Sequence, residues 1–126
     1  MAKTAAEKLG IKPEHTIYPV NPPGDYVALI GGLPPGAAVV GEKALPADVV
    51  HLFAADGAEL ARHAKTTIAA VKPGGLLWVS YLKGGASDIK RDTLVQVFVP
   101  YGWRGVSLVS VDERWSAMRF RPLPAK

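Results

Sequence analysis

The stretch KPGGLLWVSY, residues 72–81, is expected to decide the fold. Pro73 and Gly74 are residues that stop a helix, and a short apolar run follows them. Such a run, bounded by Pro and Gly, is typical of a central strand that is covered on both faces. The residues before it, 57–72, carry apolar side chains at helical spacing. This part of the chain therefore predicts a helix that ends at Pro73 and leads into a buried strand.

Outward from this stretch, segments typical of strands alternate with segments typical of helices. Helices are expected over residues 4–9, 26–30, 57–72 and 88–101, and strands over residues 16–20, 37–41, 48–53, 76–81, 106–111 and 115–120. Alternation of this kind indicates right-handed crossovers and a mostly parallel sheet, whereas the last two strands indicate an antiparallel hairpin. We expect one α/β domain over residues 1–126. It is a three-layer sandwich with a Rossmann-like sheet in the order 2-1-3-4-6-5 and a C-terminal hairpin.

The composition excludes several classes of protein. The 126 residues are 48% hydrophobic, which is enough for a core, and they include no cysteine. A disulfide scaffold, a cysteine nucleophile and a thiolate metal site are therefore excluded, and the three histidines share no metal-ligand spacing. No apolar run approaches the roughly 20 residues of a membrane span, and the N-terminus shows no signal-peptide pattern. We expect a soluble cytoplasmic protein with no bound metal and no membrane partner.

Asn21 and Gln96 are the only amide side chains in the sequence. Together with 11 prolines and two methionines, this matches the composition of heat-adapted proteins. A GC-rich genome would produce the same bias through codon usage, so both origins stay open.

The net charge of +4 is unevenly distributed along the chain. Residues 1–82 carry seven Lys/Arg and seven Asp/Glu, whereas residues 83–126 carry eight Lys/Arg and four Asp/Glu. A basic C-terminal part can indicate a surface for anions or nucleic acid, and a solvated face is the alternative.

Two stretches resemble a known family. ADVVHLFAADGAELARHAKTTIAAVKPGGLLWVSY, residues 47–81, resembles the middle of a class I S-adenosylmethionine-dependent methyltransferase. VSLVSVDERWSAMRFRP, residues 106–122, is similar to the closing hairpin of that family. The resemblance covers about residues 16–121. It implies a truncated methyltransferase fold that lacks one strand–helix unit, with S-adenosylmethionine as the cofactor it could bind.

More narrowly, the whole chain resembles a family of small uncharacterised bacterial proteins, a domain of unknown function. The similar segments are AEKLGIKP at residues 6–13, LLWVSYLK at 76–83 and VDERWSAMRFRP at 111–122. That family has no assigned activity, so the likeness adds no reaction.

Ligands of open α/β sheets bind beyond the carboxyl ends of the strands. In this sequence those ends are residues 21–25, Glu42, 54–56 and 81–85. Backbone N–H groups near Gly24 and Gly57 open helices and could hold an anion. The candidate cofactor-binding residues are Asn21, Gly24, Asp25, Glu42, Asp56 and Lys83.

Within this set, the resemblance implies that Glu42 is the carboxylate that binds ribose, and Lys83 would supply a counter-charge. The turn after the first strand departs from the family. Methyltransferases have a glycine-rich loop there, because only bare backbone can approach the cofactor closely. Here the turn is NPPGD, residues 21–25, and its prolines remove N–H donors and add bulk.

The sequence shows no nucleophile beside a general base, so no catalytic residue is assigned. His51 lies inside an apolar strand and is expected to be a hydrogen-bonded core residue.

The C-terminal hairpin offers a second candidate surface. Strand alternation places Trp115, Arg119 and Arg121 on one face. An aromatic ring in line with two arginines could stack on and clamp a nucleotide or single-stranded nucleic acid. The alternative is that Trp115 belongs to the core and the arginines protect an edge strand.

These observations favour a non-catalytic protein that binds a small anionic or nucleotide-like ligand, or a partner, in the crevice at the strand ends. A homodimer through the thinly covered edge at residues 37–42 is expected. Two alternatives stay open: a minimal S-adenosylmethionine-dependent methyltransferase, and nucleic-acid binding by the basic C-terminal face.

Overall fold

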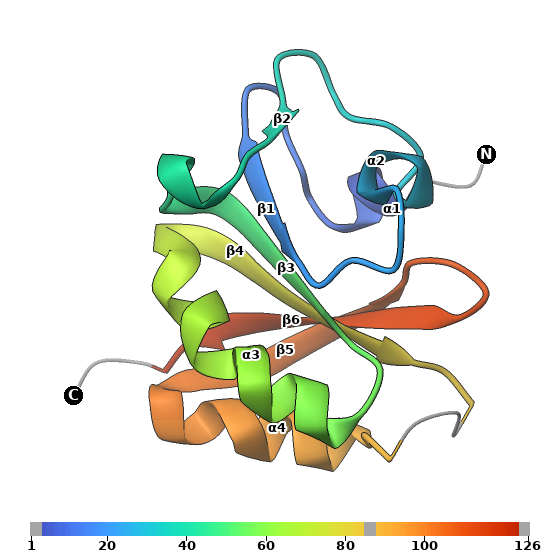
Figure 1. Cartoon of the computed structure of the whole chain (residues 1–126), viewed down its shortest axis with the longest axis vertical. Coiled ribbons are helices and arrows are strands. Elements are labelled where there is room, and N and C mark those ends of the chain that lie inside the picture. The colour runs from blue at the N-terminus through green and yellow to red at the C-terminus, as the bar shows by residue number, and fades with distance from the viewer. Residues whose placement is uncertain (1–3, 85–87, 124–126) are drawn as a thin grey trace.

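A computed structural model of the chain describes residues 4–84 and 88–123 (Figure 1). The elements in chain order are α1 (Ala5–Lys8), β1 (Thr16–Val20), α2 (Tyr26–Leu29), β2 (Ala38–Val39), the 3₁₀ helix η1 (Glu42–Ala44), β3 (Ala47–Ala54), α3 (Gly57–Ala70), β4 (Val71–Leu82), α4 (Arg91–Phe98), the 3₁₀ helix η2 (Val99–Tyr101), β5 (Trp103–Ser110) and β6 (Trp115–Pro122). None of the helices in the described ranges is long and apolar enough to span a membrane.

The sheet has six strands in the order β2-β1-β3-β4-β6-β5. The first four strands are parallel to one another, and β6 runs antiparallel to both β4 and β5. This arrangement confirms the predicted strand order and the predicted C-terminal hairpin.

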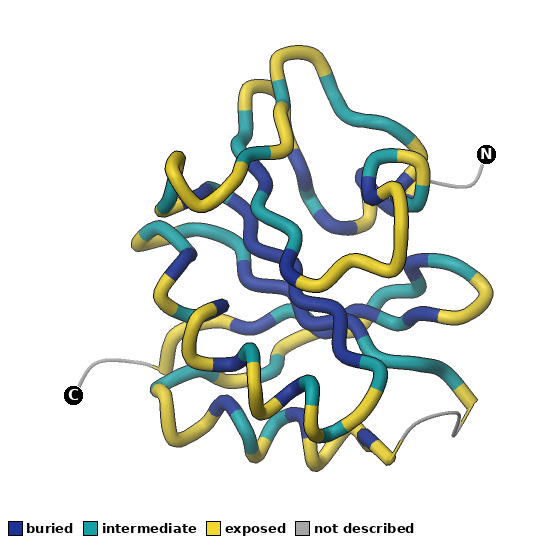
Figure 2. The backbone as a smooth tube through the Cα atoms, in the orientation of Figure 1, coloured by how far each residue is buried: buried dark blue, intermediate teal, exposed yellow. Residues whose placement is uncertain are grey.

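Helices cover both faces of the sheet. On one face, Leu9 after α1 and Tyr26 of α2 pack with Trp78 in a buried apolar cluster. On the other face, Leu60 of α3 and Phe98 of α4 belong to a second buried cluster. Figure 1 shows α3 and α4 together on the side of the sheet opposite α1 and α2, and Figure 2 shows buried residues concentrated in the central strands. The predicted three-layer α/β sandwich is confirmed.

Pro19 lies in β1, which is an interior strand, although proline cannot donate a hydrogen bond to a neighbouring strand. The N–H of Val40 donates to the carbonyl of Ile17, which shows that the odd-numbered residues of β1 face β2. The nitrogen of Pro19, which carries no hydrogen, therefore faces β2. Because β2 pairs only with Thr16 and Ile17, no partner for it is lost. The proline costs no bond between β1 and β3.

The segment 72–75 differs from the prediction. We expected the helix to end at Pro73, but α3 ends at Ala70 and β4 begins at Val71. Val71 pairs with Ala47, and the next pair joins Leu76 to Val49. Two residue steps in β3 therefore lie opposite five in β4, so residues 72–75 bulge out of the strand.

Gly75 is fixed in this bulge by a close approach of backbone. A Cβ atom on Gly75 would lie 2.9 Å from the carbonyl oxygen of Asp48 and 2.9 Å from that of Lys72. Both atoms are main chain, so neither can move aside without distorting the pairing of β3 with β4. The bulge therefore requires glycine at this position.

We expect Gly75→Ala to lower the free energy of unfolding by about 1–3 kcal/mol, because the added methyl group forces a backbone shift. Gly41→Ala is the matched control, since a Cβ there meets no atom within 4 Å and its φ is −103°. The control should change stability by less than about 0.5 kcal/mol. Urea denaturation of both variants measures the difference, and equal stabilities would contradict the steric argument.

Two other predicted boundaries differ from the structure. The strand expected over residues 37–41 is only Ala38–Val39. The last predicted helix begins at Arg91 and not at residue 88. It ends at Phe98, and Tyr101 is exposed in η2.

Candidate functional site

The turn after β1 lies at the carboxyl end of the parallel strands, as predicted. Asn21 has a left-handed backbone with φ of +56°, a conformation that glycine would usually supply. Its side-chain N–H group donates to the carbonyl of Phe53 and to Oε1 of Glu59, both at 3.0 Å. The asparagine therefore makes the sharp bend after β1 and ties it to the end of β3.

The two prolines of this turn do not fill the space beside it. Residues 21–25 are all exposed, and a Cβ atom on Gly24 would meet no atom within 4 Å. A hollow of about 370 Å³ borders the turn, lined by Pro23, Gly24, Asp25, Ala28 and Leu29. The turn is thus open to a ligand from the side of α2.

Two carboxylates cap the helices that begin at this edge of the sheet. Oδ1 of Asp25 accepts the N–H of Ala28, and Oδ1 of Asp56 accepts the N–H of Glu59 at 2.9 Å. Each therefore caps the helix that follows it.

The N–H of Gly57 donates to Oδ1 of Asp88 at 2.8 Å. The first turn of α3 is thus already occupied by a carboxylate of the chain, which corrects the expectation of a free anion site at Gly57.

The sequence analysis missed two residues of this edge, Glu59 and Asp88. Oε1 of Glu59 accepts the N–H of Ala55 at 2.9 Å as well as the side-chain N–H of Asn21. The hydrogen-bond partner of Asp88, Gly57, lies 31 residues away in sequence, and local spacing carries no signal for such a contact.

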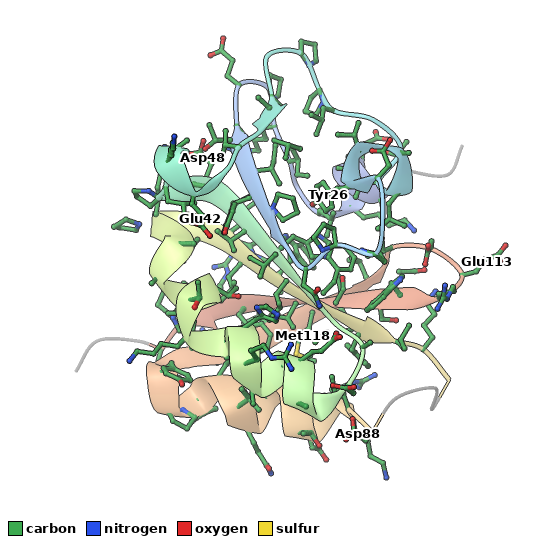
Figure 3. All side chains as sticks on the ribbon, in the orientation of Figure 1. Tyr26, Glu42, Asp48, Asp88, Glu113 and Met118 are labelled. Atoms are coloured by element: carbon green, nitrogen blue, oxygen red, sulfur yellow. The ribbon has the colours of Figure 1, made fainter. Side chains whose placement is uncertain are left out.

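Glu42 and Lys83 do not join the Asn21 turn. Glu42 opens η1, which leads into the amino end of β3, and Figure 3 shows it far from Asp88. Nζ of Lys83 donates to Oγ of Ser110, so this ammonium group is held by the hairpin. The placement leaves Asn21, Gly24, Asp25 and Asp56 at the carboxyl edge, and Gly85 lies outside the described residues.

Trp115 cannot stack on a nucleotide. It is 5% exposed, and its ring makes an edge contact with Phe53 at a centroid distance of 5.2 Å. The alternative of a core tryptophan is therefore the correct one. Arg119 and Arg121 follow Trp115 on the same face of β6, and Arg121 is exposed.

His51 joins a buried polar chain on the α1 side of the sheet. Its Nδ1 lies 2.9 Å from the hydroxyl of Tyr26, and its Nε2 lies 2.5 Å from Oγ of Ser80. His51 and Ser80 are 0% exposed and Tyr26 is 5% exposed. These three buried side chains are closed to a substrate, so their hydrogen bonds serve to connect α2, β3 and β4. This is the role expected for a hydrogen-bonded core histidine.

Burial determines the protonation states of His51 and Tyr26. It lowers the pKa of His51 to about 3 and raises the pKa of Tyr26. The neutral imidazole supplies one donor and one acceptor, and hydroxyl groups can complement both. The folded protein therefore keeps His51 uncharged throughout the neutral and mildly acidic range.

This pKa predicts a specific loss of stability in acid. Between about pH 6.5 and pH 3 the unfolded chain protonates His51 and the folded chain does not, so unfolding becomes easier as pH falls. Between pH 7 and pH 5 this residue should remove about 2 kcal/mol from the free energy of unfolding. Urea denaturation at both pH values should show that His51→Gln loses this pH dependence, whereas His63→Gln retains it. An unchanged dependence in His51→Gln would contradict a neutral buried imidazole.

No set of three or more His, Cys, Asp or Glu side chains that could hold a metal ion occurs in residues 4–84 and 88–123. Polar groups at the carboxyl edge are carboxylates, an amide and backbone N–H groups. Such groups bind hydroxyl, amino and carboxyl groups of an organic ligand through hydrogen bonds.

Comparison of the fold with solved structures shows a methyltransferase-like class. The ribosomal protein L11 methylase of Lactobacillus delbrueckii subsp. bulgaricus aligns with a TM-score of 0.65 at 10% identity, over 95% of this chain and 75% of that one. The 1,6-didemethyltoxoflavin-N1-methyltransferase of Burkholderia thailandensis, solved with S-adenosylhomocysteine, aligns at 0.59 and 13% identity over 95% and 75%. A protein of the NADB-Rossmann superfamily from Streptococcus agalactiae aligns at 0.60 and 11% identity over 100% and 70%. The predicted truncated methyltransferase-like fold is confirmed.

In sequence, no family model matches the chain, and none of the curated proteins matches it. The structural comparison corrects the functional interpretation drawn from the sequence. Two of these three similar solved structures are named as enzymes that transfer methyl groups. They contradict the expectation of a non-catalytic binding protein and favour the alternative of a minimal methyltransferase.

Proposed function

We propose that the chain is a minimal S-adenosylmethionine-dependent methyltransferase that binds its cofactor beside residues 21–25. The observation that carries the proposal is the open turn after β1. Asn21 makes the glycine-like bend there, and a hollow of about 370 Å³ remains beside Gly24. The prolines that argued against a cofactor are exposed and leave this space free.

The residues at this edge fit part of such a cofactor. S-adenosylmethionine supplies a methyl group already activated on a sulfonium. The backbone N–H groups of Gly24 and Asp25 donate to no other residue within the described ranges, so they are free for a carboxylate or a ring nitrogen. Asp25 and Asp56 each use one oxygen as a helix cap and keep the second for a hydroxyl or amino group.

Transfer of a methyl group depends mainly on holding the donor and acceptor in line, which requires positioning more than a nucleophile–base pair. The absence of such a pair from the sequence is therefore compatible with this reaction. The remaining role of the protein is to bind and orient the methyl donor and acceptor, and to exclude water from them. The rigid ends of β1 and β3, joined through Asn21, suit that role.

We expect isothermal titration calorimetry to detect S-adenosylhomocysteine, the demethylated product, binding with one site per chain. Ala28→Trp should weaken the binding by about tenfold or more, because the indole would occupy the hollow. Ala28 is exposed on α2, so the variant should fold. Ala69→Trp places the same ring on an exposed position of α3 and should leave affinity unchanged.

An absence of heat and of thermal shift with millimolar S-adenosylmethionine and S-adenosylhomocysteine would overturn the proposal. Equal binding by Ala28→Trp and the wild type would show that the cofactor does not bind in this hollow.

A further inference from the structure

A second cleft lies at the other end of the strands, on the α1 face of the sheet. It has a volume of about 400 Å³, and its walls are the loop after α1, the bulge at 72–75 and Arg119 of β6. Its charged and titratable lining residues are Lys12, His15, Asp48, Lys72 and Arg119. Because this cleft lies at the amino ends of β3 and β4, it is separate from the proposed cofactor site.

The lining of this cleft is basic. With His15 neutral, the three cations and one carboxylate give a formal charge of +2. Asp48 is satisfied by the chain itself: its Oδ1 lies 3.2 Å from Nζ of Lys72, and its Oδ2 accepts the N–H of Thr16 at 2.8 Å. The backbone hydrogen bond from Thr16, together with Lys72, holds the pKa of Asp48 below its usual value. Lys12 and Arg119 remain without a carboxylate partner among the described residues.

Arg119 carries an unused donor. Its Nε is buried and has no hydrogen-bond partner among the residues that the structure describes. A buried donor without a partner costs free energy, and the cost is larger for a charged group. Burial, with the nearby charge of Arg121, also lowers the pKa of Arg119. An anion in the cleft would pair with the guanidinium of Arg119, which lines it, and would stabilise the charged form.

His15 offers a further donor to the same cleft. The backbone N–H of Lys12 donates to Nδ1 of His15 at 3.1 Å. This bond requires Nδ1 to be unprotonated, so the proton of the neutral ring is on Nε2. His15 therefore presents an N–H group, in a cleft that already contains a lysine and an arginine.

We propose that this cleft binds the phosphate group of a phosphorylated ligand. A guanidinium can bind two phosphate oxygens at once, and a lysine and an imidazole N–H can complete the coordination of the anion. A volume of about 400 Å³ also falls in the range of small-ligand sites, so it can hold a ligand of nucleotide size. Two sources share this chemistry: a small phosphorylated compound, and the backbone of a single-stranded nucleic acid.

Pyrophosphate is the first probe, measured by isothermal titration calorimetry at low ionic strength. We expect saturable binding of one pyrophosphate per chain, and Arg119→Gln should weaken it about tenfold or more. Lys12→Gln, in an exposed loop, should also weaken it and tests the site without altering the sheet. Arg62→Gln is the matched control: it removes the same charge from an exposed position on α3 and should change affinity by less than about twofold.

Asp48→Asn gives a readout that general damage to the fold would not produce. Loss of the carboxylate releases Lys72 and raises the positive charge of the cleft, so affinity for pyrophosphate should increase by about threefold or more. Tighter binding by Asp48→Asn together with weaker binding by Arg119→Gln would support a specific phosphate site.

A single-stranded decanucleotide distinguishes the two sources. Arg104 pairs with Arg121 across the hairpin, outside the walls of the cleft. A nucleic-acid backbone that continues over the hairpin would lose affinity in the double variant Arg104→Gln/Arg121→Gln, whereas pyrophosphate would not. Either source supports the phosphate site, provided that Arg119→Gln weakens the binding. No saturable binding of either probe, or equal losses in Arg119→Gln and Arg62→Gln, would overturn the proposal.

Discussion

The close approach of Gly75 to the carbonyl oxygens of Asp48 and Lys72 is the contact on which much of the structure depends. It sets the point at which β4 resumes regular pairing after its bulge. From Leu76 onward β4 is in register with β3, and Trp78 lies opposite Arg119 of β6. The bulge thus determines which residues of the hairpin face each end of the strands.

Trp78 connects the sheet to the layer of helices that contains α1. Its indole Nε1 donates to the carbonyl of Leu9 at 2.9 Å, which anchors the end of α1 on the sheet. The loop that follows α1 supplies Lys12 and His15 to the basic cleft. A side chain buried in the core therefore fixes one wall of a surface cleft, while the bulge of the same strand forms another.

The hydrogen-bonded side chains of Tyr26, His51 and Ser80 fix the position of α2 at the opposite end of the sheet. They connect α2 to β3 and β4 through hydrogen bonds inside the core. Because α2 follows directly after residues 21–25, these bonds also restrain the position of the open turn. A neutral histidine is suited to this task, since a charged one would require a counter-ion that the cluster around it does not contain.

Much of the fold was predictable, because strand order follows from local alternation and from the handedness of crossovers. The site was less predictable. The turn at residues 21–25 was correctly assigned to the end of β1, but the environment of Glu42 depends on where β2 stops. Pro19 has no N–H to offer beyond Ile17, so β2 ends at Val39 and the chain turns into η1. Alternation likewise assigned Trp115 to the correct face without revealing its depth, and the contact of Asp88 with Gly57 depends on tertiary structure alone.

The contact of Asp88 with the first turn of α3 adds a negative charge to the carboxyl edge of the sheet. Asp56, Glu59 and Asp88 gather negative charge where β3 ends, while Lys12, Lys72 and Arg119 gather positive charge where the strands begin. The two proposed sites therefore lie beside groups of opposite sign. Ligands of opposite charge could occupy them together without competing for the same groups.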